Sequence, residues 1–117
     1  MLIYKIFRDA EWRALKTDGA TLGAPIDLAD GYVHTSTALQ AGETAAKYFA
    51  DVDGLWLVAM ETDALGDDIK WEVSRGGDKF PHLYREMRLS DVVWAKPLPI
   101  VNGTHQFPAE IVGPLPA

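Results

Sequence analysis

The chain has 117 residues, of which 48% are hydrophobic and 24% charged, values that fit one globular domain over residues 1–117 rather than a disordered or fibrous chain. Its formal net charge of −6 argues against broad binding to nucleic acid or to an anionic membrane, although a local basic pocket can still hold a small phosphorylated ligand. There is no cysteine, and the N-terminus lacks the apolar run of a signal peptide or membrane span, so we expect a cytoplasmic protein without disulfides.

The first half of the chain predicts two helices, each following a strand. LIYKIF, which starts at residue 2, has the apolar and β-branched composition of a strand, and Asp9 can cap the helix that comes next. Glycines and a turn signal predict a loop over residues 19–31, which leads into a short strand over residues 32–35. Apolar and small residues at helical spacing then predict a helix over residues 37–50.

The second half predicts mostly strands. LWLVAME is a near-continuous apolar run, typical of a central strand buried on both faces. Alternating patterns predict strands over residues 69–73 and 82–87, and DVVWAKPL predicts another, which the turn signal Asn102-Gly103 pairs with a final segment within residues 105–111. Because most of about six strands follow one another after two main helices near the N-terminus, the sequence predicts an α+β fold.

The run GYVHTST places one of the three histidines of the chain at a strand end, directly before a helix. Because strand side chains alternate, Tyr32, His34 and Ser36 are expected to share one polar and aromatic face. Such a face is a candidate ligand site, with His34 as a catalytic residue and Ser36 and Thr37 as substrate-binding residues. The alternative is structural, because TALQ, starting at Thr37, matches the capping box, and the imidazole then needs only a nearby carbonyl.

A second polar face is expected around FPHLY, where His82 and Tyr84 stand two residues apart on a strand. His82 is a candidate catalytic residue and Tyr84 a candidate substrate-binding residue. Glu72, the third catalytic candidate, adjoins Trp71, and an aromatic neighbour that excludes water can raise the pKa of a carboxyl group. The alternative is that His82 titrates at the surface and Glu72 lies on the solvated side of an edge strand.

No metal site is expected, because the three histidines lie far apart and the chain has no HxxxH or HExxH pair and no cysteine. GxSxG, GxGxxG and GxxxxGKS/T are also absent, which disfavours serine hydrolases and the Rossmann and P-loop folds. Lys5 and Arg8 are candidate substrate-binding residues that could hold a phosphate, although no spacing in the sequence brings the basic residues together.

DGYVHTSTALQ, the WE pair at residues 71–72 and FPHLY make the chain resemble the bacterial family catalogued as domain of unknown function 952, from YKIF to VVWAKPL. The pattern of this family in turn resembles the ADP-ribosyltransferase superfamily, notably the RNA 2′-phosphotransferases and rifampin ADP-ribosyltransferases. In those proteins a strand ending in a His-x-Ser or similar motif runs into a helix and then a buried strand. The HTS run at His34, residues 37–50 and LWLVAME follow the same order here.

This resemblance implies an ADP-ribosyltransferase-like split β-sheet whose cleft binds NAD as a substrate and breaks its nicotinamide–ribose bond through an oxocarbenium-like transition state. His34 and Ser36 match the positions on the ribose side. Tyr84 as a stacking ring, His82 as a residue that orients a substrate and Glu72 as the carboxylate are assigned by their chemistry alone. The implied activity is that of an ADP-ribosyl transferase or an NAD glycohydrolase.

The first strand lacks the histidine with which these transferases usually begin, because YKIF is followed by Arg8 and Asp9. Lys5 or Arg8 would have to replace that histidine electrostatically. Two alternatives are therefore open: a non-catalytic domain that binds a nucleotide or another small ligand, and a protein-interaction domain that presents exposed tryptophans. The tryptophans concerned are Trp56, Trp71 and Trp94. The sequence leaves the oligomeric state and the acceptor of any transfer open.

Overall fold

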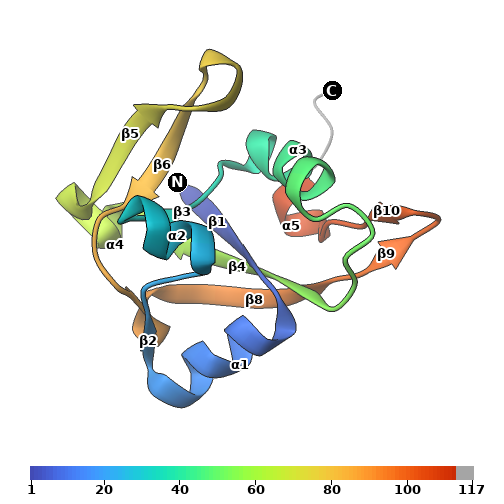
Figure 1. The fold of residues 1–117 in the computed structure, drawn as a ribbon, viewed down its shortest axis with the longest axis horizontal. Coiled ribbons are helices and arrows are strands. Elements are labelled where there is room, and N and C mark those ends of the chain that lie inside the picture. Colours follow the sequence, from blue (N-terminus) through green and yellow to red (C-terminus); the bar gives the residue numbers. More distant parts are fainter. Residues whose placement is uncertain (113–117) are drawn as a thin grey trace.

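Two three-stranded sheets form the framework of the structure, a computed structural model that describes residues 1–112 (Figure 1). The first sheet has the order β1-β4-β8, formed by Leu2–Phe7, Leu55–Glu61 and Val92–Leu98. The second has the order β3-β6-β5, formed by Val33–His34, Lys79–Leu83 and Ile69–Val73. Two short pairs complete the strands: β2 (Ala20–Thr21) with β7 (Met87–Arg88), and β9 (Ile100–Val101) with β10 (Thr104–His105). Within this part of the chain every pairing is antiparallel, and the α+β class predicted from the sequence is confirmed.

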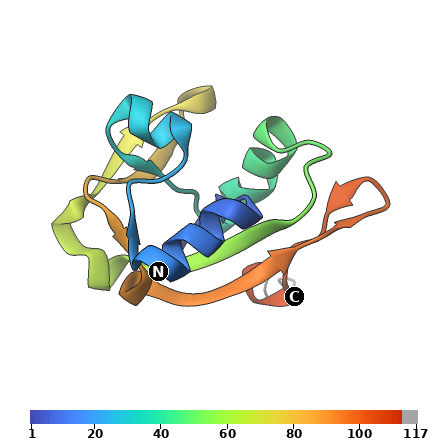
Figure 2. The same ribbon diagram turned by 60° about the horizontal axis from the view of Figure 1, so that its bottom comes forward.

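Helices cover both faces of the first sheet. The helices are α1 (Asp9–Asp18), α2 (Pro25–Asp30), α3 (Ala38–Tyr48), α4 (Thr62–Leu65) and α5 (Ala109–Val112). Trp12 and Leu15 of α1 pack in one cluster with Val58 of β4, whereas Ala45 of α3 packs with Leu57 in another. Figure 1 shows α3 on one side of β4 and β8 and α1 on the other, and Figure 2 shows α1 lying along the same strands. Because β4 lies between two layers, its side chains are buried on both faces, as LWLVAME predicted.

The Thr37 side chain caps α3. Its Oγ1 accepts a hydrogen bond from the backbone N of Gln40 at 3.3 Å, and Gln40 Oε1 accepts one from the backbone N of Thr37 at 3.0 Å. This reciprocal pair confirms the capping box predicted from TALQ. The helix is shorter at both ends than predicted, since residues 37–50 include the cap and two residues beyond Tyr48.

Thr37→Ala is expected to lower the free energy of unfolding by about 1 kcal/mol, because the first turn of α3 loses its side-chain acceptor. Thr37→Ser keeps the hydroxyl and is expected to stay close to the wild-type value. Urea denaturation followed by circular dichroism measures both differences. An alanine variant as stable as the serine variant would show that the cap does not contribute.

The loop predicted over residues 19–31 contains β2 and α2, so this prediction is wrong for most of its length. The helix α2 begins at Pro25, whose fixed φ suits a first helical residue, and it ends before Gly31, which adopts a φ of 84°. Ile26 and Leu28 are exposed, so the helix lacks the apolar stripe by which longer helices are recognised in a sequence.

The strand predicted over residues 82–87 is wrong beyond Leu83. Both terminal nitrogens of Arg85 donate to the Asp91 carboxylate, at 2.9 and 3.0 Å, and this pair holds the chain in a bend. Met87 then belongs to β7, which pairs with β2 instead of continuing the second sheet. The alternation resembled one strand because Leu83 and Met87 are both buried, although they belong to different strand pairs.

The last predicted strand is also wrong over most of residues 105–111. The Asn102-Gly103 turn joins β9 to β10, but β10 ends at His105 and α5 follows Pro108. Proline has no backbone N–H for a sheet ladder and suits the start of a helix, which explains the change.

The tryptophans that the sequence offered as an exposed surface do not form one. Trp56 is half-buried, packs against Trp12 at a ring-centroid distance of 6.0 Å, and donates from Nε1 to Asp9 Oδ1 at 3.0 Å. Trp94 is half-buried against Tyr4 of β1. Of the three, Trp71 on β5 is exposed, at 41% of its surface.

Candidate functional site

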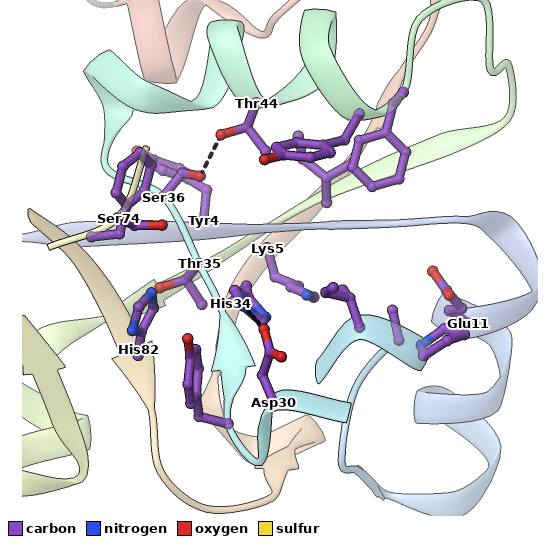
Figure 3. A pocket seen from close by; sticks show the side chains of 18 of the residues that line it. Tyr4, Lys5, Glu11, Asp30, His34, Thr35, Ser36, Thr44, Ser74 and His82 are labelled. Carbon is purple, nitrogen blue, oxygen red and sulfur yellow. Dashed lines mark hydrogen bonds and ion pairs between the residues drawn. The ribbon is translucent and has the colours of Figure 1, made fainter. Parts of the chain in front are cut away.

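A pocket of about 740 Å³ lies at the seam between the two sheets (Figure 3). Its walls come from β1, the start of α1, α2, β3, α3 and β6, so segments from most of the first half of the chain meet there. This volume is within the range of roughly 300–1,000 Å³ that is usual for small-molecule sites. The pocket is therefore the candidate functional site among the described residues.

The segment that begins at β3 joins the two sheets and places its side chains in the pocket. His34 is paired with His82 of β6 in the second sheet. Two residues later Ser36 exchanges two backbone hydrogen bonds of 2.8 Å with Tyr4 of the first sheet. Because the chain crosses from one sheet to the other within these residues, both His34 and Ser36 line the space between the sheets.

His34 lies between two carboxylates. Its Nδ1 is 2.6 Å from Asp27 Oδ1, and its Nε2 is 2.9 Å from Asp30 Oδ2. Each ring nitrogen thus faces a carboxylate oxygen to which it can donate a hydrogen bond when it carries a proton. Figure 3 shows Asp30 beside His34 at the pocket wall.

Asp27 is buried and accepts four hydrogen bonds. Its Oδ1 accepts from the backbone N of His34 at 2.9 Å as well as from the ring, and its Oδ2 accepts from Ala24 N and from Lys5 Nζ, both at 2.7 Å. Burial alone would raise the pKa of Asp27, but the bonds from His34 and the charge of Lys5 outweigh it and hold the pKa below its ordinary value. Asp27 therefore ties α2 to β1 and β3.

Gly23 is required where the chain approaches Asp27. Its φ is 102°, and a Cβ atom at this position would overlap the Asp27 carboxylate. The glycine thus permits both the left-handed backbone and the close approach.

Lys5 is the buried cation of this network. Its side chain is 6% exposed and it lines the pocket from β1. Burial lowers its pKa, and the neighbouring Asp27 carboxylate opposes that shift. The ion pair is thus held in a largely dehydrated setting, where its geometry matters more than at the surface.

A second carboxylate–histidine pair lies beside the first, on the neighbouring strands β6 and β5. His82 is buried, and its Nδ1 is 2.9 Å from Glu72 Oε1, which also accepts a 2.6 Å hydrogen bond from the Tyr84 hydroxyl. These bonds from Tyr84 and His82 lower the pKa of Glu72, so the prediction that Trp71 would raise it is wrong. The hydrogen bond between Tyr84 and Glu72 also raises the pKa of Tyr84 to about 12. Trp71 is exposed and does not exclude water from the carboxylate.

Tyr32 connects the two histidines. Its ring stacks on His82 at a centroid distance of 4.2 Å and contacts His34 at 4.6 Å, while the two imidazoles are 5.4 Å apart. Burial and the nearby carboxylates Asp30 and Glu72 raise the pKa of the Tyr32 hydroxyl. His34 and His82 therefore share one pocket and one aromatic contact, a point that the sequence left open.

The structure brings most of the predicted site residues together. His34, His82, Ser36, Lys5 and Arg8 line the pocket. Glu72 and Tyr84 do not line it and contact His82 instead, and Thr37 caps α3 outside the lining. The catalytic and binding roles given to these residues stay predictions.

Sequence reasoning missed Asp27, Asp30 and Thr44. The two carboxylates lie on α2, and the only signal for that helix was a proline followed by an acidic residue at N3, within PIDLAD. Thr44 lies on α3, and its Oγ1 is 3.0 Å from Ser36 Oγ. No local pattern indicated that this hydroxyl pair would form, because the contact depends on how α3 packs on the sheet.

The fold and the pocket define a small α+β protein with a ligand-sized cavity between two antiparallel sheets. The family described as "protein of unknown function (DUF952)" matches residues 6–95, and the chain belongs to this family. The crystal structure of protein CC0527 from Caulobacter crescentus is 46% identical, with a TM-score of 0.91 over 96% of this chain and 99% of that chain. The solution NMR structure of CC0527 is 48% identical, with a TM-score of 0.80 over 89% and 90% of the two chains.

No curated protein matches the chain. Among the described residues, no helix has the length and apolar character needed to cross a membrane.

Proposed function

We propose that this protein binds NAD in the pocket between its sheets and cleaves the nicotinamide–ribose bond, as an ADP-ribosyl transferase or an NAD glycohydrolase. The main support is the convergence of His34 and His82, each with a carboxylate partner, in a pocket of about 740 Å³. Hydroxyl and aromatic side chains line the same space, as a nucleotide with two riboses and two rings requires.

The arrangement of the sheets is consistent with this proposal. Two three-stranded sheets flank the pocket, and the segment that begins at β3 pairs with β6 at His34 and with β1 at Ser36. We propose that this is the split sheet of the ADP-ribosyltransferase-like fold, with the substrate held in the gap.

The reaction would break the bond between ribose C1′ and the nicotinamide nitrogen. Nicotinamide leaves with the bonding electron pair, C1′ gains positive charge, and water or another acceptor attacks it and gives up a proton. With Nδ1 of His82 donating to Glu72, the Nε2 atom of His82 is the proton acceptor in this scheme. Ser36 would hold a ribose hydroxyl, and His34 would donate to an oxygen of the ligand.

Nicotinamide release tests the proposal. Purified protein incubated with NAD is expected to release nicotinamide, measured by chromatography, and calorimetry is expected to detect NAD binding. His34→Ala is expected to reduce the release rate and the affinity for NAD at least tenfold, since it removes a hydrogen-bond donor from the pocket. His105→Ala is the matched control, because His105 lies outside this pocket with its Nε2 2.8 Å from the Val52 carbonyl oxygen. If the wild-type protein neither releases nicotinamide nor binds NAD, the proposal is wrong.

A second candidate function is nucleotide binding without turnover. Lys5 and Arg8 occupy the first strand and its end, where the superfamily resemblance implies a histidine, and both nitrogens of His34 already face carboxylates. Binding of NAD that weakens in His34→Ala, with no nicotinamide released by either protein, would select this function.

A further inference from the structure

Three basic side chains line the pocket, and each faces a carboxylate of the protein itself. Lys5 pairs with Asp27, and His34 pairs with Asp30 as well as Asp27. At the end of β1, Arg8 Nη1 is 3.8 Å from Glu11 Oε2. Basic side chains thus gather, with their carboxylate partners, in one pocket of a chain whose net charge is −6.

These carboxylates differ in how firmly they are held. Asp27 is buried and accepts from four donors. Moving it away would leave Lys5 Nζ and two backbone N–H groups buried without an acceptor. Asp30, by contrast, is 41% exposed, belongs to the last turn of α2, and precedes Gly31 in the left-handed conformation. Exposed ion pairs contribute little to stability, so the Asp30 carboxylate can leave His34 at small cost.

A ligand oxyanion can therefore take the position that the Asp30 carboxylate holds beside His34. Its Oδ2 lies 2.9 Å from His34 Nε2, where a charge-assisted hydrogen bond to an oxyanion would form. The ring is held from its other side by the buried Asp27, so its Nε2 stays directed at the same place when Asp30 leaves. His34 is 29% exposed and lines the pocket, and a ligand can reach it from there.

We propose that His34 Nε2 is the centre of an oxyanion-binding subsite that Asp30 occupies in the ligand-free protein. A phosphoryl group of the ligand takes the place of the Asp30 carboxylate and receives the hydrogen bond from His34. Arg8, on the same pocket lining and 49% exposed, supplies a second positive charge for the phosphoryl group. This inference rests on the proposed function, because it names the part of a nucleotide that His34 holds.

The subsite is tested with inorganic pyrophosphate, which carries the phosphoryl groups without the glycosidic bond. Pyrophosphate is titrated into ¹⁵N-labelled protein at constant ionic strength, and the ring resonances of His34 report binding. Asp30→Asn removes the competing charge and is expected to tighten binding by about fivefold or more. Asp18→Asn, an equal change of charge on the exposed end of α1, is expected to change the affinity less than about twofold.

Two ligands separate phosphoryl recognition from recognition of the rest of a nucleotide. ADP is expected to show the same gain in Asp30→Asn as pyrophosphate, whereas adenosine, which has no phosphoryl group, is expected to show none. Equal effects of Asp30→Asn and Asp18→Asn on pyrophosphate would overturn the subsite, and so would a gain for adenosine. This test does not depend on turnover. If the protein releases nicotinamide but Asp30→Asn does not bind pyrophosphate more tightly, only the subsite is refuted. If Asp30→Asn binds pyrophosphate more tightly but the protein neither binds NAD nor releases nicotinamide, only the proposed activity is refuted.

Discussion

Asp27→Asn is expected to lower the free energy of unfolding by about 3–5 kcal/mol, the range for removing one partner of a buried ion pair. The variant leaves the Lys5 ammonium buried without a counter-charge. It also replaces one acceptor oxygen by an amide that cannot serve the donors on that side. Urea denaturation followed by tryptophan fluorescence measures the change.

Asp30→Asn is the matched control for this experiment, because it removes the other carboxylate that contacts His34. Asp30 is 41% exposed, so its ion pair is expected to contribute no more than about 1 kcal/mol. Equal stabilities of Asp27→Asn and Asp30→Asn would show that the buried network does not hold the fold together.

The effect of Asp27 also depends on pH in a defined direction. Its pKa in the folded chain lies below the ordinary value, so the ionised form contributes stability above the unfolded pKa of about 3.9. That contribution is lost as the pH falls through the folded value. The difference in the free energy of unfolding between the wild-type protein and Asp27→Asn is therefore expected to become smaller as the pH falls below about 3.9.

The sequence predicted those elements that carry a strong local signal, such as a continuous apolar run or a helix cap. LWLVAME and DVVWAKPL contain β4 and β8, and the capping signal at Thr37 placed the start of α3 to within one residue. Each of these is determined by local propensity, or by burial on both faces of one sheet. The same local logic failed for residues 82–87, where the buried Leu83 and Met87 belong to different strand pairs.

The site was less predictable than the fold, because its contacts join distant parts of the chain. His34 and His82 were each recognisable as a polar residue on a strand, but their cross-strand pairing depends on the register between β3 and β6. Asp27 was not recognisable at all, since its role depends on Lys5 of β1 lying opposite a six-residue helix. An aspartate in PIDLAD is locally indistinguishable from a solvated helix residue.

Glu72→Ala is expected to bring the pKa of Tyr84 from about 12 down toward the ordinary tyrosine value of about 10. In the wild-type protein, ionisation of Tyr84 loses the 2.6 Å hydrogen bond to Glu72 and places two negative charges side by side. The absorbance of tyrosinate during an alkaline titration measures the shift, and Tyr84→Phe identifies which transition belongs to this residue.

Glu86→Ala is the control, because it removes an exposed carboxylate that lies 3.5 Å from Arg88 rather than next to Tyr84. Its titration is expected to match that of the wild-type protein, and an unchanged high pKa of Tyr84 in Glu72→Ala would contradict the assigned hydrogen bond.

Glu72→Ala also removes the partner of His82 Nδ1. If Glu72 holds that imidazole in place, as carboxylates behind catalytic histidines do, nicotinamide release should fall in Glu72→Ala and remain in Tyr84→Phe.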